Sequence, residues 1–329
     1  MDKSFFEGVR CLLPEGNNVD MQQFADFFNN AHIHHPRIKQ YNGYNLFPGF
    51  EPKTADYVYN KWEPKSGDVV VCSYPKTGTT WLREIIHQIL YSNEPDLLAK
   101  MKHFSPVFSC LEIGPVSKFE VVDNLIMRRR VFMTHLSPAC LNFDKFQRKG
   151  VKLIYIMRNP KDQVISWYHF AHQHHFIQNK VEPWDQLCPE DFGKFIDICI
   201  EGNQGYFGKQ REGYLEHVRY WYEHKDDPNI LFVMYEDLKR DFCKEVRKIS
   251  DFLEVPLSNA QVDQIMKNTS IQSMKKNVPD KATDLAKSMV RKGNVGNWKD
   301  HFTTEQSQYC DDKVKRILGN TDIQFTYEL

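Results

Sequence analysis

The sequence has no long hydrophobic run and no excess of charge of either sign. No segment approaches the roughly 20 consecutive apolar residues of a membrane-spanning helix, so we expect no membrane partner. The start of the chain is charged at Asp2, Lys3 and Glu7, where a signal peptide would be apolar. Lysine and arginine together number 43, as do aspartate and glutamate. Because no overall field attracts a polyanion, we expect no nucleic-acid partner either.

The eight cysteines lack the pattern of a disulfide framework or a zinc site. They stand singly along the chain, and no two form a C-x-x-C pair. Scattered cysteines are typical of reduced thiols, so we expect a cytoplasmic protein. Two histidine-rich stretches, 32–35 and 169–175, lack a carboxylate or cysteine at ligand spacing. We therefore expect no metal site and interpret the second stretch as a helix that lines a pocket.

Beyond residue 40, short apolar runs alternate with helical patterns. Nearly continuous apolar runs predict four strands, at Asp68–Tyr74, Arg130–His135, Val151–Arg158 and Ile230–Tyr235. After Glu236, apolar residues recur every three or four positions up to residue 253 and predict a helix. This alternation predicts a single α/β domain with a mainly parallel central sheet between helices. Residues 1–40 are interpreted as a partly irregular arm with one helix near 19–31.

The run YPKTGTTW at 74–81 predicts a phosphate-binding loop that resembles a P-loop. Gly78 allows a close turn around an anion, and the helix that follows presents free N–H groups. However, Lys76 precedes the glycine, whereas the common nucleotide loop places its lysine after the second glycine. The simpler alternative is a helix capped by threonine beside a surface lysine.

The loop closely resembles the 5′-phosphosulfate loop of the cytosolic sulfotransferases. Three further segments match that family in the same order: THL at 134–136, RNPKDQVISWYHF at 158–170 and RKGNVGNW at 291–298. The resemblance implies a sulfotransferase domain over residues 41–329. It also implies 3′-phosphoadenosine 5′-phosphosulfate (PAPS) as sulfuryl donor, without a metal. The acceptor would be a hydroxyl or amine of a small hydrophobic molecule such as a phenol, alcohol or sterol.

Two residues carry the implied chemistry. His135 ends a predicted strand, where an imidazole with a pKa near 6.5 can accept a proton. A lone histidine there could equally be a core residue, but the match to THL implies the general base for the acceptor. Lys76 would support the negative charge that develops on the departing phosphate oxygen. No acidic pair stands where a kinase would bind magnesium.

The remaining matches concern the donor. Arg158 and Ser166 are implied to bind its 3′-phosphate, although Arg158 could instead pair with Asp162. Two positions depart from the family pattern. Ile271 stands where the family has an aromatic residue, and Tyr206 is the match for the family's purine-contacting tyrosine, in a segment that is longer here. The full set assigned to the donor is Lys76, Thr77, Gly78, Thr79, Thr80, Trp81, Arg158, Ser166, Thr269, Ser270, Met289, Arg291, Lys292 and Gly293.

Three questions stay open on the sequence. The aromatic residues Phe47, Trp167, Phe170 and Trp184 either line an acceptor pocket or pack in the core. The dimer segment of the family is altered here at Thr304 and Gln308, which leaves a homodimer open but weakens the case for it. The alternatives to a sulfotransferase are a P-loop kinase and a catalytically silent protein that binds a nucleotide or a lipophile.

Overall fold

A four-stranded parallel sheet forms the centre of the protein, with strand order β4-β3-β5-β6. The computed structural model describes residues 8–17, 22, 26–27, 37–102, 104, 106–203, 207–278 and 287–329. The strands are β3 (Val69–Ser73), β4 (Val131–Thr134), β5 (Lys152–Met157) and β6 (Ile230–Met234). Each lies within a predicted strand. The predicted α/β class with a parallel sheet is therefore confirmed.

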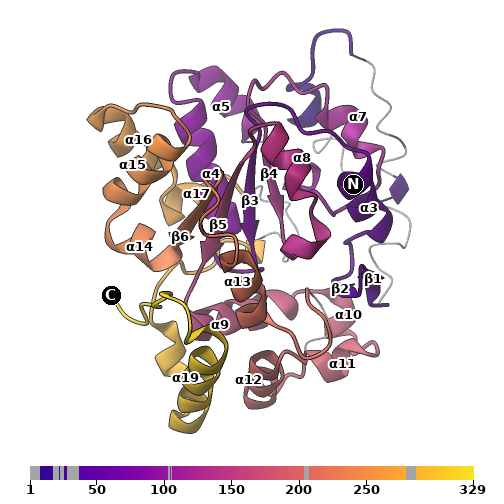
Figure 1. Cartoon of the computed structure of the whole chain (residues 1–329), viewed down its shortest axis with the longest axis vertical. Coiled ribbons are helices and arrows are strands. Elements are labelled where there is room, and N and C mark those ends of the chain that lie inside the picture. Colours follow the sequence, from indigo (N-terminus) through magenta and orange to yellow (C-terminus); the bar gives the residue numbers. More distant parts are fainter. Residues whose placement is uncertain are drawn as a thin grey trace.

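Helices cover both faces of this sheet, as buried parallel strands require (Figure 1). Tyr155 of β5 stacks on Trp221 of α13, with ring centroids 5.3 Å apart. The next residue, Ile156, points to the opposite face, where it packs against Gly78 at the start of α4. The helices are α3 (Pro52–Asn60), α4 (Thr79–Leu90), α5 (Pro95–Met101), α6 (Pro106–Ser109), α7 (Lys118–Val122), α8 (Phe143–Arg148), α9 (Pro160–Ala171), α10 (His175–Gln178), α11 (Trp184–Leu187), α12 (Phe192–Glu201), α13 (Tyr214–Tyr222), α14 (Tyr235–Arg240), α15 (Phe242–Phe252), α16 (Asn259–Asn268), α17 (Ile271–Lys276) and α19 (Thr304–Leu318).

The smaller elements are a hairpin and two 3₁₀ turns. The antiparallel hairpin consists of β1 (Lys39–Tyr41) and β2 (Tyr44–Leu46). The turns are η1 (Pro138–Cys140) and η2 (Asn297–Asp300). No helix in the described ranges combines the length and apolar composition needed to cross a membrane. The predicted boundary near residue 40 stays a prediction, and the helix expected at 19–31 falls almost wholly outside the described residues.

The single helix predicted after Glu236 is wrong in one respect, because two helices, α14 and α15, occupy this stretch. Asp241 separates them with a non-helical backbone, and its side chain accepts a hydrogen bond from the Lys244 N–H. The apolar spacing continues across the break, because Leu238 of α14 and Val246 and Ile249 of α15 are all buried. An aspartate therefore ends one helix and caps the next without disturbing the pattern.

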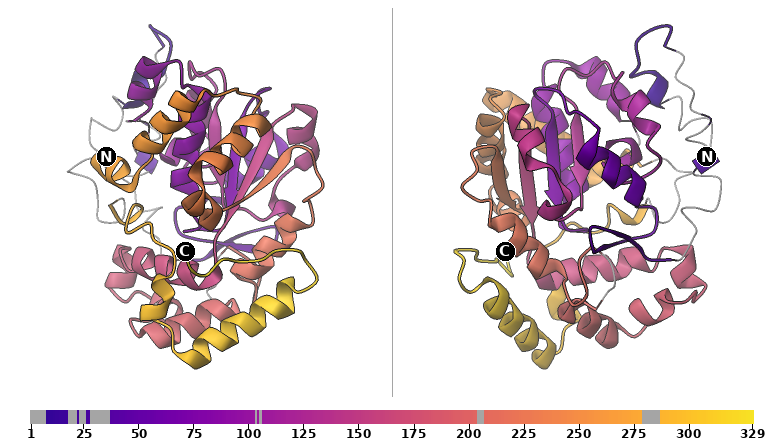
Figure 2. Two further views of the ribbon diagram at one scale, coloured as in Figure 1. Left: turned by 90° about the vertical axis from the view of Figure 1, so that its left-hand side faces the viewer. Right: turned by 45° about the vertical axis from the view of Figure 1, so that its right-hand side comes forward.

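The carboxyl ends of the strands face a second group of helices, α9, α12 and α19 (Figure 1). In both views of Figure 2, α19 lies at this end of the molecule, away from the amino ends of the strands. Lys161 of α9 donates to Ser307 Oγ and Asp311 Oδ2 of α19, each at 2.7 Å. These contacts hold α19 against the helix that follows Arg158. Ligands of open α/β sheets bind at this edge.

A buried ion pair fixes the amino ends of the two strands that lead to the loop and to His135. Asp68 precedes β3 and Arg130 precedes β4, and both are fully buried. Arg130 Nε donates to Asp68 Oδ1 at 2.9 Å, and Nη1 donates to Asp123 Oδ1 at 2.7 Å. The pair therefore supports the register in which Val69 lies opposite Val131.

Replacing Asp68 by alanine should destabilise the protein by about 3–5 kcal/mol, because Arg130 would stay buried without its main partner. Urea denaturation followed by far-UV circular dichroism measures this loss. As a control, Glu63→Ala removes the exposed pair with Lys149 and should cost less than about 1 kcal/mol. Equal effects of the two substitutions would contradict the structural role of the buried pair.

Candidate active site

The loop between β3 and α4 has the close backbone approach expected of a phosphate-binding turn. Gly78 has φ 115°, and a Cβ there would lie 2.8 Å from Tyr235 Cδ2, so only glycine fits without displacement. The Thr77 hydroxyl donates to the carbonyls of Tyr74 and Ile156, at 2.9 and 3.1 Å. These two hydrogen bonds hold the loop against the end of β5. The contribution of Thr77 to an anion would come from its backbone N–H.

The threonines that follow stand at the N-terminus of α4, a twelve-residue helix. Thr79 is buried, and its hydroxyl forms a hydrogen bond with Ser73 Oγ at 2.7 Å. Thr80 is half-buried. Unpaired N–H groups and the positive end of the helix dipole favour an anion at such a terminus.

His135 follows β4 at the same edge of the sheet as the loop. Its Nδ1 lies 2.8 Å from the carbonyl oxygen of Ser73, and a carbonyl can only accept. The proton therefore sits on Nδ1, and Nε2 carries the lone pair of the neutral ring. Burial lowers the pKa of His135 below its usual value, and the charge of Lys76 lowers it further, whereas Glu112 and the Ser73 carbonyl raise it. A neutral imidazole with a free Nε2 can act as a general base.

Lys76 occupies an unusual environment for an ammonium group. Its backbone has φ 70°, which is rare for a side chain other than glycine. Its Nζ lies 4.4 Å from the centre of the Phe170 ring and donates to the Ser288 carbonyl at 3.4 Å. Burial lowers the pKa of Lys76 to about 7, and the charges of Arg158 and Arg291 act in the same direction. An anion bound among these groups would restore the charge of Lys76.

Arg158 directly follows β5, is 7% exposed and lies against the Tyr235 ring, with Cζ 4.5 Å from its centre. Its Nη2 donates to the Asn294 carbonyl at 2.8 Å, and its Nε is buried with no hydrogen-bond partner in the described ranges. The alternative pairing with Asp162 is present but long, at 3.7 Å. Asp162 instead accepts the backbone N–H of Gly296 at 2.8 Å. The guanidinium thus keeps donor capacity for a further anion.

A further cation, Arg291, lies near Arg158. Burial lowers the pKa of Arg291, and the charge of Arg158 adds to this effect. Lys292 is exposed, whereas Ser166 is half-buried on α9. Gly293 has φ 69°, and a Cβ there would lie 3.4 Å from Ile271 Cδ1. The structure therefore brings Lys76, Arg158 and Arg291 close enough to repel one another, which is the arrangement a polyanion would stabilise.

The residues expected to contact the purine make contacts within the protein. Trp81 Nε1 donates to the Thr269 carbonyl at 2.9 Å, and the Trp81 ring lies 5.3 Å from Tyr235. The Thr269 hydroxyl donates to the Ile265 carbonyl, and Ser270 caps α17. Both hydroxyl groups are thus engaged within the protein. Met289 is 38% exposed, and Tyr206 lies outside the described residues.

The predicted pocket aromatics form one buried cluster. Phe47 packs edge-on against Trp167 and Trp184, with centroids 5.4 and 5.3 Å away. Phe170, half-buried, lies 5.5 Å from Trp167. Their packing is core-like, yet Phe207 of the same cluster reaches His135, with centroids 5.9 Å apart. The cluster therefore forms an apolar wall beside the histidine.

The histidine-rich stretches contain no ligand set in the part of the chain that is described. Within those ranges, no three histidine, cysteine, aspartate or glutamate side chains lie close enough to hold a metal ion. Residues 32–35 are outside them. Burial lowers the pKa of His169 to about 4, and the charge of Arg291 is the next cause. His169 thus belongs to the surroundings of the cation cluster.

The sequence analysis did not single out several residues of the site. Ser73 is the last residue of β3 and supplies the carbonyl that orients His135. Glu112 accepts the His135 backbone N–H at 2.6 Å. Phe50 lies 6.1 Å from the His135 ring. Of these, only Ser73 had a usable signal, since it directly precedes the recognised loop.

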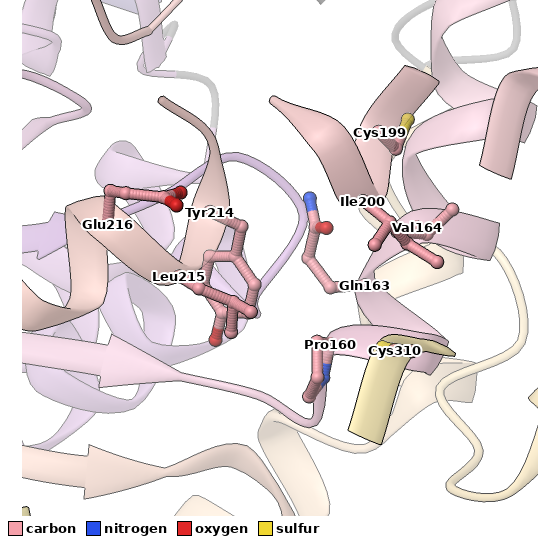
Figure 3. A pocket seen from close by; sticks show the side chains of 9 residues that line it. All are labelled: Pro160, Gln163, Val164, Cys199, Ile200, Tyr214, Leu215, Glu216 and Cys310. Atoms are coloured by element: carbon pink, nitrogen blue, oxygen red, sulfur yellow. The ribbon is translucent and has the colours of Figure 1, made fainter. Parts of the chain in front are cut away.

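A small internal cavity lies apart from these groups, behind α9 (Figure 3). Its volume of about 20 Å³ is enough for one water molecule but not for a nucleotide. Gln163 points into it, and its Nε2 also donates to the Pro75 carbonyl at 2.9 Å. The lining residues are Pro160, Gln163, Val164, Cys199, Ile200, Tyr214, Leu215, Glu216 and Cys310. Gln163 thus links the wall of the cavity to the loop at Pro75, and the cavity is too small to be the candidate site.

The site thus combines a loop suited to bind a phosphate with a histidine suited to act as a base, at the ends of neighbouring strands of an α/β sheet. Comparison with known proteins defines the family. The protein-family model described as "Sulfotransferase domain" matches residues 66–322, which is well over half of the chain. The chain therefore belongs to the sulfotransferase family, and the resemblance inferred from the four motifs is confirmed.

Individual relatives agree with this result. Human sulfotransferase 1C2 is 30% identical over 291 residues, which cover 85% of this chain and 93% of the relative. The amine sulfotransferase of Oryctolagus cuniculus is 32% identical over 283 residues, covering 82% and 86%. Among solved structures, mouse sulfotransferase SULT7A1 complexed with PAP is 27% identical with a TM-score of 0.69, covering 87% of this chain and 95% of that one.

The amine of Lys76 should titrate near neutrality in the free protein, because burial and two nearby cations disfavour its charged form. Competitive labelling with a trace acylating reagent, resolved by mass spectrometry, measures the pH at which each lysine becomes reactive. Lys76 should reach half of its full reactivity near pH 7, well below the pH of about 10.4 that is usual for a lysine in water. In Arg158→Gln the midpoint should rise. Titration of Lys76 near pH 10.5 would contradict this assignment.

Proposed function

We propose that the protein transfers the sulfuryl group of PAPS to a hydroxyl or amine of a small, hydrophobic acceptor. The observation that carries this proposal is the contact of 2.8 Å between His135 Nδ1 and the Ser73 carbonyl oxygen. The Nδ1–H is bound to this carbonyl, so Nε2 is available as a base on the edge of the sheet that also carries Lys76. Family membership supplies the reaction class, and the geometry supports these two residues as its catalytic groups.

The proposed step balances as a direct displacement at sulfur. The acceptor O–H or N–H gives its proton to His135 Nε2, and the acceptor atom forms a bond to sulfur. The bond between sulfur and the 5′-phosphate oxygen breaks, and its electron pair stays on that oxygen. The product of the donor is 3′-phosphoadenosine 5′-phosphate (PAP). Lys76 donates to this oxygen as its negative charge grows. Binding of the anionic donor would keep Lys76 protonated, although its pKa is lowered to about 7 in the free protein.

The donor would lie against the loop at 74–81 and against the cation cluster formed by Lys76, Arg158 and Arg291. Arg158, Arg291 and Lys292 would bind the 3′-phosphate, with the Ser166 hydroxyl and the Gly293 backbone. Residues 77–80, at the start of α4, would hold the 5′-phosphate through their N–H groups. Trp81 would contact the purine, flanked by Thr269, Ser270 and Met289. The PAP in the structure of mouse SULT7A1 supports this choice of donor.

The aromatic residues beside His135 support the proposal that the acceptor is apolar. Phe207 and Phe50 flank the imidazole, with centroids 5.9 and 6.1 Å from it. Rings in this position favour an apolar acceptor whose single polar group points at Nε2. Phenols, alcohols and sterols fit this description, and the amine sulfotransferase among the relatives keeps amines in the set. We also propose a cytosolic location, on the scattered cysteines of the sequence.

A catalytically silent protein that binds the same ligands is the second candidate. It is favoured by one observation, the engagement of the Thr269 and Ser270 hydroxyls within the protein. A kinase is less well supported, because Lys76 precedes Gly78 in the loop. Incubation with PAPS labelled in its sulfuryl group and a panel of phenols, sterols and amines separates the candidates. PAPS binding without transfer to any acceptor would favour the silent protein.

In His135→Ala, transfer should fall roughly 10²–10⁴-fold at saturating donor, because the acceptor loses its base. PAP affinity, measured by calorimetry, should stay within about twofold of the wild type. His224→Ala is the matched control, since His224 stacks on Phe143 and has no role in the proposed site. Undiminished transfer in His135→Ala would refute the general-base assignment.

Arg158→Gln should raise the KM for PAPS by roughly 10–100-fold, because a charge-assisted hydrogen bond to phosphate is worth about 1.5–3 kcal/mol. The loss should be much smaller for adenosine 5′-phosphosulfate, which lacks the 3′-phosphate. Steady-state kinetics with both donors measures the difference. An equal loss for the two donors would place the 3′-phosphate elsewhere.

A further inference from the structure

Glu112 is a fully buried carboxylate that the reaction described above does not use. Its segment runs beside the end of β4, where Cys110 forms an isolated parallel bridge to Met133 and the Leu111 N–H donates to the Met133 carbonyl at 2.9 Å. The glutamate side chain therefore enters the core next to the last residue of the strand. A buried carboxylate is costly unless it is fully bonded.

Both of its oxygens contact the strand end that carries the histidine. Oε1 accepts the backbone N–H of His135 at 2.6 Å, and Oε2 accepts the Thr134 hydroxyl at 2.9 Å. The same hydroxyl oxygen accepts the Leu136 N–H at 3.1 Å. One carboxylate thus holds three consecutive residues, with the histidine in the middle.

We propose that Glu112 is the positioning residue of His135, which fixes the backbone from which the imidazole reaches Ser73 and stabilises the imidazolium formed during transfer. This inference rests on the proposed function for its catalytic part. The positioning itself depends only on contacts within the protein. Glu112 acts through the backbone of His135 and would not touch either substrate.

The other charged and titratable groups around the histidine cannot supply this stabilisation. Lys76 lowers the pKa of His135, as burial does, whereas Glu112 raises it. Burial lowers the pKa of His217 to about 3, so this ring is neutral and its Nε2 donates to the His135 carbonyl at 3.2 Å. Tyr155 donates to the other nitrogen of His217 at 2.9 Å. Glu112 is the anion that opposes these effects.

A purely architectural role is the competing explanation. Lys118 is also buried beside Glu112, and its Nζ donates to the carbonyls of Cys110, Leu111 and Ile113. Burial lowers the pKa of Lys118 to about 8, and the charge of Glu112 raises it. If Glu112 served only this lysine and the local backbone, its replacement would change stability but not the titration of His135.

Glu112→Gln is the decisive variant, because it keeps the shape of the side chain and removes the charge. The pKa of His135, followed by NMR of its Cε1–H and assigned by its absence in His135→Ala, should fall by roughly one unit. The acid limb of the kcat/KM profile should move to lower pH by the same amount, since the base must be neutral to accept a proton. Transfer at pH 7.5 should fall at least about tenfold.

Two further variants separate charge from architecture. Thr134→Val removes one hydrogen bond but keeps the carboxylate, so transfer should fall while the His135 pKa stays within about 0.3 units of the wild type. Glu245→Gln neutralises another buried carboxylate, on α15, and should change neither. Far-UV circular dichroism and urea denaturation confirm that each variant folds.

An unchanged His135 titration in folded Glu112→Gln would overturn the inference. This outcome is distinct from failure of the proposed function, which would appear as absence of transfer by the wild type. Because the NMR titration needs no substrate, it tests the influence of Glu112 on His135 in either case.

Discussion

The hydrogen bond from His135 Nδ1 to the Ser73 carbonyl joins the ends of two neighbouring strands, and the candidate site depends on it. Strands β3 and β4 run parallel with Val69 opposite Val131 and Cys72 opposite Thr134. The next residue of each strand is therefore Ser73 on one side and His135 on the other. This contact orients the imidazole, fixes its tautomer and places it beside the loop that begins one residue later.

The charges of the site explain why it needs an anionic ligand. Lys76, Arg158 and Arg291 are brought together, and the one carboxylate described beside the arginines, that of Asp162, lies 3.7 Å from Arg158 and also accepts the Gly296 N–H. Burial and mutual repulsion lower the pKa of Lys76 to about 7. A donor with two phosphate groups would relieve this repulsion, so binding of the donor and protonation of Lys76 are coupled.

Much of the fold was predictable because parallel strands buried on both faces leave continuous apolar runs in the sequence. Those runs locate β3 to β6 within one or two residues, and residues just after them form the site. The break between α14 and α15 was missed because Asp241 leaves the apolar spacing intact. Glu112 and Phe207 were missed for another reason. They reach His135 from distant loops, through contacts that no local pattern records.

The roles of Thr77, Thr269 and Ser270 show a second limit of sequence reasoning. Their motifs match the family, but the hydroxyl groups bond to carbonyls or cap a helix within the protein. Any contact they make with a donor would have to come from the backbone or from a change in these bonds. Motifs identify which residues are near a ligand more reliably than which atoms bind it.

A crystal structure of the protein with PAP tests the central claim most directly. The account predicts the 5′-phosphate at the N-terminus of α4 and the 3′-phosphate against Arg158 and Arg291. Lys76 should have turned from the Ser288 carbonyl toward the 5′-phosphate, and His135 Nε2 should face the vacant acceptor side. A nucleotide bound outside this edge of the sheet, or a His135 that no longer donates to Ser73, would contradict it.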